Sequence, residues 1–283
     1  MVLWRSILRK DMNRHNGGNT FTMNELKQYL RRIYHFGKKS VTRDTKAPAK
    51  FTNLGFCYSC NRTTRFTARQ DWWRDHYLCD HCGSIPRERA VMYCIEKFYP
   101  DWREKVIHES SPVFRGTSLR LRNEAKNYQP SQYFPGVERG VMHRGFRNED
   151  LEQLTFEDDS IDLHVTQDVF EHVFDPAQAF REIARTLKPG GAHIFTTPLV
   201  NKNFPTQWCA RMGSNGVIEH LIDPPEYHGN PVSAEGSLVM VHWGFDILKF
   251  IHDACGLFTE MIYIDALEFG IRAEYIEVLI TRK

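Results

Sequence analysis

Two closely spaced pairs of cysteines constrain this sequence more than any other feature. Cys57 and Cys60 form one C-x-x-C motif, and Cys79 and Cys82 form a second. A two-residue spacer lets both thiolates of a tight turn point at one ion, and two such turns supply four sulfur ligands for a tetrahedral zinc ion. Because four thiolates fill the coordination shell, we expect structural zinc in a small zinc ribbon. The alternative is redox chemistry, which would normally need only one C-x-x-C motif.

The stretch between the two motifs interleaves arginines with aromatic residues. It contains Arg62, Arg65, Phe66, Arg69, Trp72, Trp73 and Arg74. Such side chains together can follow phosphates and stack on bases or sugars. The interpretation that we favour is that the tryptophan pair packs the small module against its neighbour.

The charge of the chain is unevenly distributed. The formal net charge is +2, yet residues 1–50 hold 12 Lys and Arg against 3 Asp and Glu. This basic arm indicates either an anionic partner or a solvated leader, and a helix is expected within it at about residues 23–35. No stretch is apolar enough to span a membrane, and residues 1–10 are too short and too charged for a signal peptide. We therefore expect a cytoplasmic protein whose cysteines are free thiols or metal ligands.

The remaining sequence divides into two segments. Residues 51–100 contain the cysteine motifs and a helix expected from Pro86 to Phe98, which begins on a proline suited to the first helical turn. Residues 101–283 alternate apolar runs with helical patterns. That alternation is typical of βαβ units and predicts an α/β domain built on a parallel sheet.

One βαβ unit is particularly clear. A strand is expected near residues 161–165, a helix over about 176–187 and a second strand near 192–196. The helix places Phe180, Ile183 and Leu187 on one face, and Lys-Pro-Gly-Gly follows it with a cation and then helix breakers.

The segment 150–198 strongly resembles class I S-adenosylmethionine-dependent methyltransferases of the type 11 kind. Its acidic turn, Ser-Ile-Asp-Leu-His-Val, Glu171-His172-Val and Arg-Glu-Ile with Leu-Lys-Pro-Gly-Gly are similar to the family's motifs. The resemblance implies a Rossmann-like, seven-stranded methyltransferase sheet with the cofactor over the carboxyl ends of its first strands. Fainter similarity extends over about 105–283, with last strands near 258–265 and 273–282.

The resemblance also implies roles for single residues. Asp150 corresponds to the family's acidic residue that faces the adenine amino group, and Leu151 would flank the ring. Gln167 and Asp168 follow the strand at the position where the family lines the methionine end of the cofactor. The Glu-His-Val segment lies near the family's reaction centre.

The first motif departs from the family pattern. The family has a strand, an acidic residue and then a Gly-x-Gly turn, but here Glu109 is followed by Ser110 and Ser111, and the next glycine is Gly116. The two small serines would take the place of the glycines beside the cofactor. The acidic residue expected after the second strand is also replaced, because residues 127–134 offer only neutral polar groups.

The segment 199–244 is too long for a plain connection, and we expect it to cover the substrate. Histidines suit proton transfer near neutral pH, so His172, His220 and His228, with His242 beside them, are candidate bases. The favoured acceptor is a hydroxyl of a sugar, a glycan or another small polar molecule. The alternatives are an RNA methyltransferase that uses the basic arm and the ribbon, and a non-catalytic scaffold with a degenerate cofactor pocket.

Overall fold

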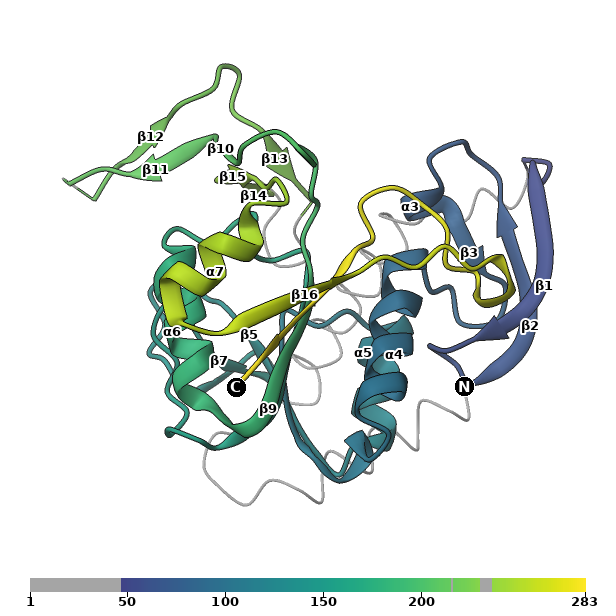
Figure 1. Ribbon diagram of the computed structural model, residues 1–283, viewed down its shortest axis with the longest axis horizontal. Coiled ribbons are helices and arrows are strands. Elements are labelled where there is room, and N and C mark those ends of the chain that lie inside the picture. The colour runs from purple at the N-terminus through teal and green to yellow at the C-terminus, as the bar shows by residue number, and fades with distance from the viewer. Residues whose placement is uncertain (1–46, 215, 230–235) are drawn as a thin grey trace.

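The computed structural model describes residues 47–214, 216–229 and 236–283. Nearly all of the basic arm, with its expected helix, therefore lies outside the described residues. The described chain forms a small three-stranded sheet beside a large eight-stranded sheet that is covered by helices on both faces (Figure 1). Among the described helices, none is both long enough and apolar enough to cross a bilayer.

The small sheet carries the cysteines, and we call residues 51–82, which contain it, the ribbon. Strands β1 (Phe51–Cys57), β2 (Arg62–Ala68) and β3 (Tyr77–Cys79) pair antiparallel in that order, and the short helix α3 (Trp73–His76) precedes β3. Phe66 and Tyr77 are fully buried between the strands. This sheet is too small to bury a large core, which is the situation in which a bound metal stabilises a fold.

The large sheet has the order β16-β17-β9-β8-β4-β5-β7-β6. Its strands are β4 (Val106–Ser110), β5 (Asn127–Gln132), β6 (Met142–His143), β7 (Phe146–Asn148), β8 (Ile161–Gln167), β9 (Leu187–Thr196), β16 (Phe258–Ile262) and β17 (Val278–Arg282). Strand β17 is antiparallel to both of its neighbours, whereas β4, β5, β7, β8 and β9 run parallel. The seven strands expected from the resemblance are present, and the two-residue β6 adds an edge.

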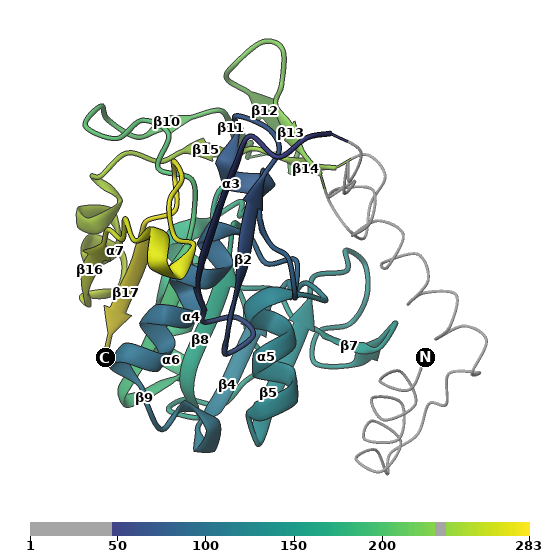
Figure 2. The same ribbon diagram turned by 90° about the vertical axis from the view of Figure 1, so that its right-hand side faces the viewer.

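Helices cover both faces of this sheet (Figures 1 and 2). Helices α4 (Pro86–Phe98) and α5 (Gly116–Glu124) share one apolar core with the sheet, and α6 (Pro176–Thr186) and α7 (Ile247–Cys255) share the other. Neighbouring residues of β9 alternate between these cores, because successive side chains of a strand point to opposite faces. The helix α4 agrees with its predicted bounds, and α6 ends just before Leu187 because that residue starts β9.

The segment between β9 and α7 forms a layer of short strand pairs. They are β10 (Gln207–Trp208) with β15 (Val241–His242), β11 (Ala210–Met212) with β12 (Ile218–His220), and β13 (Tyr227–His228) with β14 (Ser237–Leu238). This layer lies above α7 in Figure 1 and continues from the end of the sheet where the parallel strands finish.

The small sheet is fastened to the large one by two other parts of the chain. The loop between β16 and β17, which contains the 3-10 turn Leu267–Phe269, reaches across to β1 (Figure 1). There Asn53 Nδ2 donates to the Leu267 carbonyl at 2.6 Å. The fully buried Arg89 of α4 donates to the carbonyls of Gly270 and Tyr77 at 2.6 and 2.8 Å. Residues 51–100 therefore share their packing with the C-terminal part of the domain.

Three buried histidines stand side by side across the centre of the sheet. His108, His164 and His193 lie in register on β4, β8 and β9, and each is fully buried. The Nδ1 atoms of His108 and His164 are 2.8 Å apart, and His164 Nε2 lies 2.8 Å from the Thr186 hydroxyl. Burial lowers the pKa of His108 and of His193 to about 3, and lowers that of His164 well below its ordinary value.

This row of buried histidines should make the free energy of unfolding decrease in acid. The unfolded chain protonates histidine near pH 6.5, whereas the folded protein holds these rings neutral, so the unfolded state binds more protons below that pH. We expect the free energy of unfolding to fall between about pH 6.5 and pH 3, by up to about 1.4 kcal/mol per pH unit for each histidine.

Urea denaturation over a series of pH values measures this slope. His193→Gln should make it shallower by about one histidine's contribution. His220→Gln should leave it unchanged, because that side chain is exposed on β12. An unaltered slope in His193→Gln would contradict the assignment.

Candidate active site

A large cavity opens at the carboxyl ends of the parallel strands. Its volume is about 2090 Å³, and its wall is built from the ends of β4, β5 and β8, the ribbon, and the β13–β14 pair. Ligand pockets of typical size measure roughly 300–1,000 Å³, so this cavity has room for a cofactor and an acceptor together. Its position is the usual crevice of open α/β sheets.

The loop after β4 forms one side of the cavity. Ser110 and Ser111 line it, and Ser111 has a φ of 57°, the left-handed conformation that glycine adopts without strain. The backbone thus makes a glycine-type turn although the sequence has serine. Gly116 begins α5 outside the lining, and a Cβ there would lie 2.3 Å from Glu88 Oε2, so packing against α4 explains this glycine.

Glu109 lies behind this loop and not in the lining. It is 1% exposed and accepts hydrogen bonds from Ser118, Tyr128 and Gln167 at 2.5, 2.6 and 3.2 Å. Burial raises the pKa of Glu109 to about 7, against the lowering effect of these donors. Its place indicates that it holds the loop and Gln167 in position.

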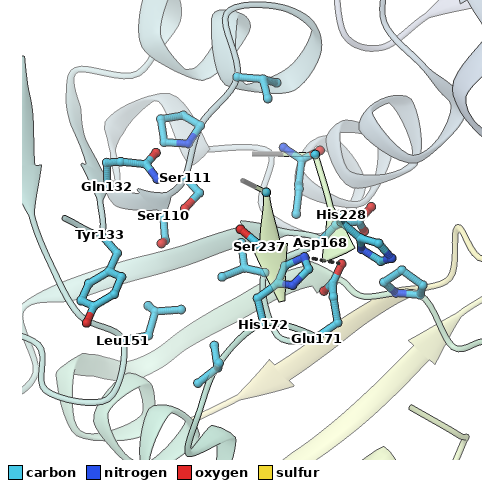
Figure 3. A pocket seen from close by; sticks show the side chains of 18 of the residues that line it. Ser110, Ser111, Gln132, Tyr133, Leu151, Asp168, Glu171, His172, His228 and Ser237 are labelled. Atoms are coloured by element: carbon cyan, nitrogen blue, oxygen red, sulfur yellow. Dashed lines mark ion pairs between the residues drawn. The ribbon is translucent and has the colours of Figure 1, made fainter. Parts of the chain in front are cut away.

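The wall of the cavity also carries the residues predicted for the adenine end. Asp150 and Leu151 both line it, and Asp150 Oδ1 accepts from the Glu152 amide at 2.9 Å. Gln132 and Tyr133, at the end of β5, lie near them in the lining (Figure 3). Gln132 occupies the end of the second strand, where the family's acidic residue was expected, so its amide is the polar group available there.

Asp168 is held by the ribbon and the helix that follows it. Arg74 of α3 and Arg87 of α4 approach Asp168 Oδ2 at 2.6 and 3.1 Å, and the Thr196 hydroxyl donates to Oδ1 at 3.1 Å. Burial alone would raise the pKa of Asp168, but the two guanidinium groups outweigh it and lower the pKa to about 2. The sequence singled out Arg74 only within the arginine–aromatic stretch and did not single out Arg87, because no local pattern shows that these arginines meet the aspartate that follows β8.

A cluster of three side chains also belongs to the wall of the cavity. Glu171, His172 and His228 all line the cavity and face one another in Figure 3. Their donor atoms lie within 4.8 Å of one another, and the two imidazole rings are 5.1 Å apart. Burial, followed by the negative charge of Asp168, raises the pKa of Glu171 to about 7, whereas burial lowers the pKa of His172.

The other two histidines lie elsewhere. His220 is exposed on β12 and is absent from the cavity lining, so the structure does not bring it to the other candidate bases. His242 on β15 is 2.8 Å from Glu226 Oε2, and Glu226 Oε1 is 3.0 Å from His228 Nε2. Glu226 therefore bridges His242 and His228, and in this way it links His242 to the cluster.

The four cysteines of the two motifs come together at one end of the small sheet. Their sulfur atoms lie within 4.8 Å of one another, with 3.8 Å between Cys57 and Cys82 and 3.9 Å between Cys60 and Cys79. Tetrahedral zinc with Zn–S bonds of about 2.3 Å requires about 3.8 Å between its sulfur ligands. The cluster therefore has the spacing that a zinc ion needs.

Comparison with known proteins agrees with this geometry. The family model described as "Methyltransferase domain" matches residues 122–195. The chain is 44% identical over 100 residues to dimethylglycine N-methyltransferase of Parasynechococcus marenigrum (strain WH8102), covering 35% of this chain and 31% of that protein. It is 29% identical over 104 residues to ubiquinone biosynthesis O-methyltransferase of Coxiella burnetii (strain RSA 493 / Nine Mile phase I), covering 37% and 40%. The chain thus spans less than half the length of these relatives.

A solved S-adenosylmethionine-dependent methyltransferase from Mesorhizobium loti is 18% identical and aligns with a TM-score of 0.44 over 69% of this chain and 98% of its own. The sheet order and the family match confirm the α/β Rossmann-like methyltransferase fold predicted from the sequence. Residues 122–195 are therefore similar to a methyltransferase domain.

The ion pairs of Asp168 should contribute measurably to stability. Asp168→Asn leaves Arg74 and Arg87, which have little solvent access, with the longer contacts to Asp75 at 3.9 and 3.7 Å, so we expect the free energy of unfolding to fall by roughly 3 kcal/mol. Urea denaturation at pH 7 measures the change. Asp80→Asn is the matched control: its pair with Arg65 is longer, at 3.7 Å, and exposed, so it should cost about 0.5 kcal/mol or less. Equal losses in the two variants would contradict the role given to Asp168.

Proposed function

We propose that the protein transfers a methyl group from S-adenosylmethionine to a hydroxyl of a sugar, a glycan or another small polar acceptor. The observation that carries this proposal is the single cavity wall that joins Ser110, Asp150 and Gln132 to the Glu171–His172–His228 cluster. One part offers contacts for a nucleoside-like cofactor, and the other offers groups that handle a proton. The cavity is large enough for both ligands.

The residues of the wall fit the cofactor. The Asp150 carboxylate can accept from the adenine amine, and Leu151 supplies an apolar surface beside it. The Gln132 amide can bond to the ribose hydroxyls, and the left-handed turn at Ser111 keeps the backbone close to the cavity. The bound cofactor supplies an electrophilic methyl group on a sulfonium.

The chain's own residues would align the acceptor and take up its proton. Alignment of nucleophile, methyl carbon and departing sulfur is the main requirement of an in-line transfer. His172 Nδ1 bonds to the Leu238 carbonyl at 2.8 Å, which fixes the ring and places the proton on Nδ1. Its Nε2 is then unprotonated, as a general base requires. The β13–β14 pair brings His228 to the same wall of the cavity.

A nucleic-acid acceptor has less support from the ribbon. Trp73 stacks on Phe51 with 4.8 Å between ring centres and lies 4.9 Å from the ring of Tyr77, so it serves internal packing. Arg74 is paired with Asp168. These groups would have to be free to hold a nucleic-acid strand.

We also propose that Cys57, Cys60, Cys79 and Cys82 bind one structural zinc ion. The sulfur spacing supports this, and four thiolates leave no position open for a substrate. The ion would hold together a sheet that carries Arg74 and Trp72 into the cavity wall.

Calorimetric titration with S-adenosylmethionine and with its demethylated product tests the cofactor site. The wild type should bind both, and Asp150→Ala should weaken binding about tenfold, the effect of one lost hydrogen bond. Asp253→Ala, on the exposed surface of α7, should bind as the wild type does. Absence of binding by the wild type would favour the non-catalytic scaffold.

Native mass spectrometry tests the zinc site. The wild type should carry one firmly held zinc ion, and Cys60→Ser should lose it, whereas Cys255→Ser on α7 should retain it. Structural zinc is worth on the order of 10 kcal/mol in small domains, so chelation should lower the melting temperature markedly. A chain that carries no zinc and melts unchanged in chelator would refute the site.

A further inference from the structure

The Glu171 carboxylate has one oxygen that the protein leaves unused. Glu171 is 2% exposed, and its Oε2 accepts from the Thr197 hydroxyl at 3.0 Å. Within the described part of the chain no hydrogen-bond partner reaches Oε1, although this atom is fully shielded. A buried carboxylate oxygen without a partner is costly, and an ion that is missing from the coordinates is one recognised explanation.

The nearest groups to that oxygen are suited to a metal. His172 Nε2 lies 3.7 Å from Glu171 Oε1, too far for a hydrogen bond but suitable for two ligands of one ion. One ring nitrogen of His228 completes a set of three donor atoms within 4.8 Å (Figure 3). Two imidazoles and one carboxylate form a donor set typical of Zn²⁺, Mn²⁺, Fe²⁺ and Co²⁺ sites.

A hydrogen bond to another part of the chain also orients each of the three side chains. The Leu238 carbonyl holds Nδ1 of His172, and Thr197 holds the second oxygen of Glu171. Glu226 holds His228 and is itself bonded to His242. Hydrogen bonds of this kind fix the tautomer and direction of metal ligands.

We propose that Glu171, His172 and His228 bind a divalent transition-metal cation on the wall of the cavity. Unlike the four-cysteine cluster, three protein ligands leave at least one position open, and here the ligands line the cavity. The natural occupant of that position is an oxygen of the acceptor.

The consequence for the reaction rests on the proposed methyl transfer. An acceptor hydroxyl on the cation has a lowered pKa, and its proton leaves to water. The acceptor oxygen then forms a bond to the methyl carbon, the carbon–sulfur bond breaks, and the sulfur keeps that electron pair. The cation thus takes over the task otherwise given to a free histidine, and the acceptor class narrows to molecules that present a metal-binding hydroxyl.

Calorimetric titration with Co²⁺ of the full chain, its four-cysteine cluster first filled with zinc, tests the site. The wild type should bind one further equivalent of Co²⁺, and its absorption spectrum should lack thiolate-to-cobalt bands. His172→Asn and His228→Asn should each weaken binding at least tenfold. Glu171→Gln, which keeps the shape and the Thr197 contact, should do the same. His252→Asn, exposed on α7, is the matched control and should bind as the wild type does.

No uptake beyond the zinc-filled cluster by the wild type would overturn the proposal. So would binding that survives both histidine substitutions in variants whose circular dichroism matches the wild type. The S-adenosylmethionine titration is a separate readout, so a failure of the cation site is distinguishable from a failure of the methyl-transfer function.

Discussion

The contact of Asp168 with Arg74 and Arg87 is the interaction on which the arrangement of the site depends. Asp168 directly follows β8, a central strand of the large sheet, whereas Arg74 belongs to the ribbon and Arg87 to the helix that follows it. The aspartate has a positive φ of 53°, a conformation that a non-glycine residue keeps only when its surroundings fix it. Two guanidinium groups and the Thr196 hydroxyl supply that constraint and bring the ribbon to the cavity wall.

This contact makes the ribbon part of the cavity wall and not a separate module. A ribbon tied to the sheet through buried charges cannot turn freely, and Arg89 and the β16–β17 loop restrict it further. Its residues Trp72 and Arg74 belong to the cavity as much as those of β4 or β8 do. A zinc ion in the cysteine cluster would therefore stabilise the wall of the site as well as the ribbon.

The sequence contains enough to predict the sheet and much of the lining. The apolar periods of 161–196 and the Lys-Pro-Gly-Gly breaker are local signals, and the strands and helix formed where those signals lie. The resemblance placed Asp150 and His172 near the cofactor by motif and Ser110 by its position after the first strand, and all three line the cavity because the ends of parallel strands fall at one edge. Glu109, Gly116 and His220 lie outside the lining, since their surroundings come from distant packing: α4 meets Gly116, and a separate hairpin carries His220.

The groups that no motif indicated are those whose partners are remote in sequence. Arg87 and Asp168 are far apart along the chain, and Glu226 reaches the cluster only through the fold of the 199–244 segment. Because its partners are also remote in sequence, Glu171 was identified from the sequence as part of a motif and not as a metal ligand. The shielded oxygen of Glu171 that lacks a hydrogen-bond partner can be recognised only in the folded chain, where the large sheet and the β13–β14 pair lie around it. Among the described residues, that oxygen is a fully shielded atom of the cluster with no hydrogen-bond partner, so a cation is the simplest group that satisfies it and binds both imidazoles at once.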